Sequence, residues 1–143
     1  MKKEKQTNEN VELEACYYRA MHDLDIFTYR LKYVDKELKM AKEEIKVLTL
    51  AQKAFLGMDK YVENNLMKQF YDVKDSMYMM RKSIRAHHKN LSDYFILQPA
   101  KEVLYNYKAK DVIALMDEKE GMIDGELDKC GAYLKLFEVA ATV

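Results

Sequence analysis

The residues best suited to chemistry in this 143-residue chain form a basic cluster around two adjacent histidines. His87 and His88 lie in a stretch without acidic residues, which extends from Ser76 to Ser92. The permanent cations of this cluster are Arg81, Lys82, Arg85 and Lys89. Such cations, with tyrosines close by for stacking, are typical of sites for phosphate groups, nucleotides or nucleic acids. The cluster therefore predicts an anion site, and nucleic-acid or nucleotide binding is the alternative function for this chain.

The overall charge argues against a generic nucleic-acid binder. The chain has 24 Lys plus Arg and 24 Asp plus Glu, so its formal net charge is zero. A neutral chain has no global positive field, and any anion binding must come from a local patch. The competing interpretation of the basic cluster is a solvated helix face that is balanced by carboxylates on another helix.

An acidic stretch follows later in the chain, from Asp117 to Asp128. A calcium loop that starts at Asp117 would need Gly at its sixth position, where Met122 stands. We therefore interpret the stretch as an exposed acidic helix face. Glu120 is the exception, because it occupies a core position and should pair with a cation from another helix or another chain.

Catalytic and metal signatures are absent from the sequence. The residues three positions before the histidines are Arg19, Ile84 and Arg85, whereas di-metal helical bundles need Glu there. Cys16 and Cys130 belong to no Cys-x-x-Cys unit, and Cys130 lies in an apolar register where a thiol is inert. No glycine-rich phosphate loop occurs. We predict a protein that is not an enzyme and that has no cofactor and no metal site.

The element that dominates the sequence is a long helix predicted over about 10–56. Eleven apolar residues follow one another there at alternating spacings of four and three, which is the repeat of a coiled coil. They are Leu13, Tyr17, Ala20, Leu24, Phe27, Leu31, Val34, Leu38, Ala41, Ile45 and Leu48. At 1.5 Å per residue this helix would be roughly 70 Å long. Either the molecule is elongated or the helix breaks.

The same helix carries a second apolar stripe on a face about 160° from the first. Its members recur every seven residues and are Ile26, Tyr33, Met40, Val47 and Ala54, of which the first four are the predicted self-association residues. Because a simple hairpin needs one buried face, this second stripe must meet a third helix or another copy of the chain. We predict self-association through it, with a homodimer as the leading state.

Gly57 and Pro99 divide the remaining sequence into helices. Gly57 suits a helix C-terminus, and Asp59 suits the N-cap of the next helix. That second helix continues the heptads through His87, with one irregular four-four step between Val62 and Phe70. We expect it to end near 97, or earlier at 90–92. Tyr71 and Tyr78 lie off its main stripe and are predicted to contact a partner protein.

Pro99 is well placed in the first turn of a third helix. Its heptads run through Ile113, Glu120 and Cys130, but three glycines weaken them. If Asp111 caps a new helix, the chain has four helices instead of three.

These observations predict an all-α, elongated antiparallel coiled-coil bundle of three or four helices. We expect a polar tail over 1–9 and one helical domain over 10–143. The longest stretch without Asp, Glu, Lys or Arg is 94–100, far shorter than the roughly 20 apolar residues of a membrane span, and no signal peptide is recognisable. We therefore expect a cytoplasmic protein without a membrane association. Its predicted function is that of a scaffold, adaptor or inhibitor that binds a protein partner.

Overall fold

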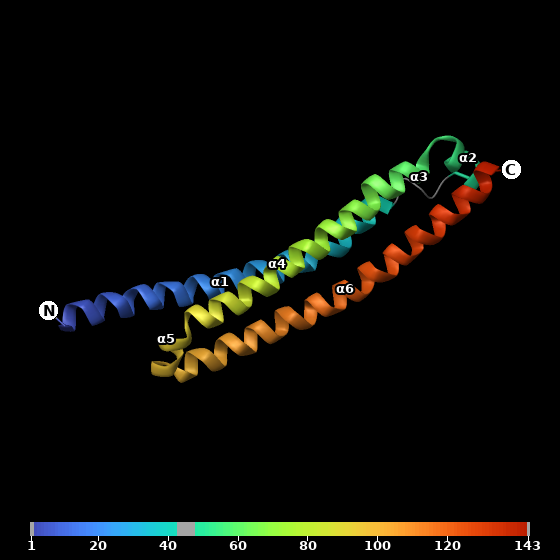
Figure 1. The fold of residues 1–143 in the computed structure, drawn as a ribbon. Helices are drawn as coiled ribbons and strands as arrows, with labels where there is room; N and C mark the ends of the chain where they lie inside the picture. Colours follow the sequence, from blue (N-terminus) through green and yellow to red (C-terminus); the bar gives the residue numbers. More distant parts are fainter. Residues whose placement is uncertain (1, 43–47, 143) are drawn as a thin grey trace. The chain divides into compact units, whose positions relative to one another are not determined.

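The computed structural model describes the backbone of residues 2–42 and 48–142, and the side chains of 10–40 and 48–140. The described chain is 95% helical and contains no strands, which confirms the predicted all-α class. Its long helices are α1 (Lys2–Lys42), α4 (Lys68–Asn90) and α6 (Pro99–Thr142), and they pack together (Figure 1). The shorter helices are α2 (Leu50–Phe55), α3 (Met58–Tyr61), the π-helical segment η2 (Val62–Met67) and α5 (Ser92–Leu97).

The chain divides into two compact units. The first unit comprises residues 1–31 and 78–116, and the second unit comprises residues 32–77 and 117–143. Each unit therefore contains one segment of each long helix. The single domain over 10–143 stays a prediction. The backbone of α1 begins at Lys2, inside the segment that the sequence suggests is a tail.

Side-chain contacts fix the helix directions inside the first unit. Tyr17 of α1 lies against Tyr94 of α5, and Asp23 of α1 pairs with His87 of α4. The segment formed by α4 and α5 therefore runs in the direction opposite to α1. The α6 residues Lys101 and Lys108 contact Tyr18 and Asp25 of α1 in the same order along both helices. Within this unit α4 is thus antiparallel to both α1 and α6.

The apolar repeat of α1 forms its buried face, as predicted. Six of its residues are at most 6% exposed: Tyr17, Ala20, Leu24, Leu31, Val34 and Leu38. Leu13, Phe27 and Leu48 are half-buried. Ala41 and Ile45 lie outside the described side chains. The heptads therefore gave the buried face of this helix correctly.

Of the two outcomes expected for the helix predicted over about 10–56, the break is the one found, because the helix does not continue through Thr49. Thr49 has an extended backbone (φ −66°, ψ 162°), and it begins α2 as an N-cap. Its side chain accepts from the Gln52 amide, while the Gln52 side chain accepts from the Thr49 amide. This reciprocal capping box satisfies helix donors that would otherwise lack partners, so a new helix starts here.

Gly57 ends α2 in the left-handed conformation, with φ 74°. It fills the position after the C-cap, where a side chain would be strained. Because Gly57 is also the N-cap of α3, Asp59 lies in the first turn of that helix and is not its cap, contrary to our expectation.

The irregular step of the second predicted helix coincides with η2. Val62, Leu66 and Phe70 are all buried although they are spaced by four and four. In a π-helix the amide bonds to the carbonyl five residues back, so each turn takes up more residues than in an α-helix. A spacing of four then returns to the same face, which explains the stutter in the heptads.

The boundaries near Pro99 agree with the earlier of the two predicted helix ends. Helix α4 ends at Asn90, and Gln98 leaves the helical conformation (φ −131°, ψ 68°) before α6 begins at Pro99. Helix α6 continues without a break past Asp111, so the four-helix alternative based on a cap at that residue is wrong.

The predicted register of α6 needs a correction at two positions. Ile113 is 38% exposed and Glu120 is half-buried, whereas Val112 and Lys119 are 2% and 7% exposed. Because successive helical residues point about 100° apart, Ile113 and Glu120 fall at the edge of the buried face. The buried charge is the Lys119 ammonium, which donates to the Asp35 carboxylate within the second unit.

In the described residues, none of the helices combines the length and the apolar character that crossing a membrane requires.

Candidate functional site

Aromatic rings hold α4, α5 and α6 together in the first unit. Phe95 packs against Tyr17, His88 and Tyr105, with ring centroids 5.5–6.2 Å apart. The Tyr105 hydroxyl donates to the Ile84 carbonyl at 2.7 Å, which ties α6 to α4. Burial, and then the Asp23 carboxylate, raise the pKa of Tyr105 to about 12, so this hydroxyl keeps its proton at neutral pH.

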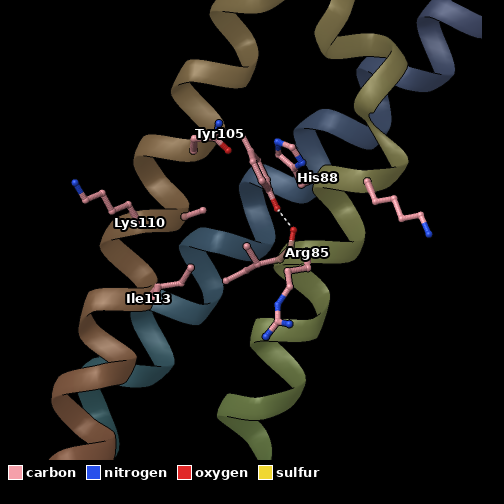
Figure 2. Close-up of a pocket in the computed structure, with 9 residues that line it drawn as sticks. Arg85, His88, Tyr105, Lys110 and Ile113 are labelled. Carbon is pink, nitrogen blue, oxygen red and sulfur yellow. Dashed lines mark hydrogen bonds between the residues drawn. The ribbon is translucent and has the colours of Figure 1, made fainter.

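A groove lies between α4 and α6 beside this tyrosine, with a volume of about 450 Å³. Figure 2 shows Arg85 and His88 on α4 across from Tyr105 and Ile113 on α6. The residues that line the groove are Ile84, Arg85, His88, Lys89, Tyr105, Asn106, Ala109, Lys110 and Ile113. We call it the α4–α6 groove. Its base is apolar, and its permanent charges are all positive.

The cations of the α4–α6 groove differ from other cations of the first unit in their partners. Lys108 pairs with Asp25 at 3.0 Å, and a His87 ring nitrogen lies 2.9 Å from the Asp23 carboxylate. Among the described residues, no carboxylate lies within salt-bridge distance of the groove cations Arg85, Lys89 and Lys110. His88 lies 3.9 Å from Glu102. The three permanent charges of the groove are exposed, and the described residues place no carboxylate beside them.

The structure distributes the predicted anion-binding residues over different surroundings. Arg85 and Lys89 line the groove. The Lys82 ammonium lies 5.4 Å from the centre of the Tyr78 ring, and Arg81 is half-buried and engaged within the chain. Sequence reasoning missed Lys110, because it comes from a different helix and no local motif connects it to α4.

The members of the second stripe that lie on α1 are exposed wherever their side chains are described, whereas Ala54 lies on α2 and is half-buried. Ile26, Tyr33 and Met40 are 40%, 44% and 67% exposed, and Val47 lies outside the described residues. Three further large residues share this side of the helix at helical spacing and are also exposed: Val11, Tyr18 and Tyr29. We call these six residues together the outer stripe of α1. A search for spacings of three and four would have found the three additional members.

The two predicted partner-binding tyrosines are also exposed. Tyr71, in the second unit, is 50% exposed, and Tyr78, in the first unit, is 58% exposed. Their spacing of seven places both on one side of α4. Lys82 and Arg85 follow Tyr78 by four and seven residues, so aromatic and cationic side chains share that side of the helix in the first unit.

Other candidate groups are accounted for by pairing or burial. Cys130 is buried and Cys16 is half-buried, and neither forms a disulfide in the described part of the chain. Asp124, in the acidic stretch, accepts a hydrogen bond from Lys74 at 2.9 Å, and this bond raises the pKa of the lysine. Within the described residues, no group of three His, Cys, Asp or Glu side chains could hold a metal ion.

The fold and these surfaces define a helical-bundle protein with exposed apolar and cationic helix faces. Comparison of the chain with protein-family models, curated proteins and solved structures finds no match. The function must therefore be argued from the surfaces themselves.

Proposed function

We propose that this protein is a non-enzymatic helical interaction protein that self-associates through the outer stripe of α1 and binds a protein partner. The observation that carries the proposal is the exposure of this stripe: Tyr33 and Met40 are 44% and 67% exposed, on a helix whose other face is buried at Leu31 and Leu38. The partner would be contacted through Tyr71 and Tyr78. Its action would be that of a scaffold, adaptor or inhibitor in the cytoplasm, where free thiols such as Cys16 stay reduced.

The physical argument rests on apolar surface. Burying apolar area contributes about 25 cal/mol per Å², and rows of exposed large side chains on soluble proteins commonly mark contact sites. A second helix with the same heptad spacing would cover such a row along its length. Another copy of the chain offers that helix, and a two-fold dimer is the simplest closed arrangement. An elongated antiparallel coiled-coil form is part of this proposal.

The experiment is a mass measurement by light scattering on a size-exclusion column. We expect the wild-type protein at twice its chain mass of 16.9 kDa, and the Tyr33→Glu/Met40→Glu variant at 16.9 kDa. The matched control is Lys32→Gln/Lys39→Gln, which changes the net charge by the same amount at exposed positions beside the stripe. A monomeric wild type, or a variant that keeps the wild-type mass, would refute self-association through this stripe.

Nucleic-acid or nucleotide binding is the second candidate function, and the cations of the α4–α6 groove favour it. It is weaker, because Arg81 and Lys82 have other contacts and the chain has no net positive charge. It predicts that a fluorescent oligonucleotide binds at low salt and is released by Arg81→Glu/Arg85→Glu. Binding that does not respond to salt would remove this candidate.

A further inference from the structure

We propose that the α4–α6 groove binds an acidic amphipathic helix of a partner protein. Carboxylates of that helix would pair with Arg85, Lys89 and Lys110, and an apolar side chain between them would cover Ile113. This inference rests on the proposed interaction function, and it names the surface and the chemistry of the partner.

Charge complementarity is the first argument for this occupant. The groove has three permanent cations that no described carboxylate neutralises, whereas Lys108 of the same unit has Asp25 at 3.0 Å. A ligand with carboxylates supplies the missing anions. Arg85 in particular can bind a carboxylate through two parallel hydrogen bonds, and the long stems of Lys89 and Lys110 let their ammonium groups follow the ligand.

The shape of the groove is the second argument. Arg85 and Lys89 are four residues apart, which is the spacing of acidic residues on successive turns of a facing helix. Ala109 leaves room at the base, and Ile113 offers apolar surface that is 38% exposed. The hydrogen bond from Tyr105 to the Ile84 carbonyl holds α4 and α6 together, so the groove is formed before a ligand arrives.

The same surroundings disfavour a phosphate backbone as the occupant. Glu102 lies 3.9 Å from His88, and the exposed Asp111 follows Lys110 directly on α6. These carboxylates repel a polyanion, but a helix with a few spaced carboxylates can avoid them. The apolar base also offers no favourable polar contact to a sugar-phosphate chain, whereas it can bury an apolar side chain of an amphipathic helix.

The test uses a fluorescein-labelled capped peptide of repeated Leu-Glu-Glu-Ala units and measures its fluorescence anisotropy with the full-length protein. A second peptide carries Gln in place of every Glu. The groove variant is Arg85→Glu/Lys110→Glu, and the matched control is Lys60→Glu/Lys135→Glu, which reverses the same number of exposed charges in the second unit. Circular dichroism checks that all proteins keep their helix content.

We expect the Glu peptide to bind the wild type and the control variant with equal affinity. Its affinity for the groove variant should be lower by a factor of about ten or more. Binding should weaken as salt is added, and Ile113→Ser should weaken it about threefold. The proposal is overturned if the Glu peptide does not bind, if the Gln peptide binds as well, or if the groove variant behaves like the wild type. An oligonucleotide that displaces the peptide and binds more tightly would also overturn it.

The light-scattering mass separates this proposal from self-association. The groove variant should keep the wild-type mass, because its substitutions lie away from the outer stripe of α1. If the peptide fails to bind a wild-type protein that is dimeric, only the groove proposal falls. If the wild type is monomeric but binds the peptide through Arg85, only self-association falls.

Discussion

The two units of this chain use segments of the same three long helices but bury different polar groups. In the first unit, the rings of Tyr17, Phe95 and Tyr105 pack against one another, and Tyr105 donates to a helix carbonyl. The second unit has a buried cation, Lys119, and a π-helical segment, η2. The heptad repeat therefore specifies a helical bundle without specifying what fills it.

A buried ring in the first unit and a buried ammonium in the second unit contribute to stability in different ways. Rings contribute large apolar area, and their removal leaves a cavity. A buried ammonium contributes little by itself but is costly without its partner. Substitutions in the two units should therefore differ in size and in whether a second substitution can rescue them.

The largest effect is expected for Phe95→Ala in the first unit. Phe95 is 2% exposed, and we expect the free energy of unfolding to fall by about 3–5 kcal/mol in chemical denaturation. The control is Ile96→Ala, because Ile96 is 75% exposed and its loss should change the free energy by about 0.5 kcal/mol or less. Amide hydrogen exchange sharpens the comparison: protection lost only in the first unit means that the units open separately.

Asp35→Ala should have the next largest effect, in the second unit. It leaves the Lys119 ammonium buried without its carboxylate. Because the Asp35 side chain is 44% exposed, solvent limits the cost, and we expect a loss of about 2 kcal/mol. The double variant Asp35→Ala/Lys119→Met should recover most of this stability in urea denaturation. If the single and double variants were equally stable, the unpaired Lys119 ammonium would not be the cause of the loss in Asp35→Ala.

Tyr105→Phe tests the hydrogen bond that ties α4 to α6, and Tyr17→Phe is its matched comparison. The Tyr105 hydroxyl donates at 2.7 Å, so its loss should cost about 1 kcal/mol. The buried Tyr17 hydroxyl has no hydrogen-bond partner in the described part of the chain, so its removal should leave stability unchanged or raise it. Thermal denaturation of both variants gives the difference, and an equal loss in the two would contradict it.

The raised pKa of Tyr105 also predicts a dependence on pH. The folded value is about 12 against an ordinary 10.0, so the folded state holds this proton more tightly than the unfolded state. The stability is then fully present below about pH 10 and falls as the pH rises from 10 towards 12. Tyr105→Phe should make the fall shallower in alkaline denaturation. A slope equal to that of the wild type would show that other groups cause it.

The smallest effect is expected for Gly121→Ala and Gly125→Ala in the second unit. A Cβ at either position meets no atom within 4 Å, and both residues are helical. Alanine should therefore raise the free energy of unfolding by up to about 1 kcal/mol per substitution. The melting temperature measures this gain. A lower melting temperature for Gly125→Ala would contradict this expectation.

The sequence by itself determined the helices and most of their buried faces. The unbroken heptads indicated the apolar face of α1, the four-four step indicated an irregularity where η2 lies, and Gly57 and Pro99 marked two helix boundaries. These features follow from local chemistry: helical periodicity, the conformational freedom of glycine and the fixed φ of proline. The break before Thr49 was also local, since Thr49 and Gln52 form a capping box, but the strong heptads concealed it.

Only the tertiary structure decided which neighbouring residue is buried and which charges pair. Val112 and Lys119, and not Ile113 and Glu120, face the interior, because the neighbouring helices cover the side of α6 that carries Val112 and Lys119. Lys110 joined Arg85 at the groove although 25 positions separate them in the sequence. Periodicity fixes the side of a helix that is apolar, but the neighbours that meet that side depend on how the helices pack, and this is set by all of their side chains together.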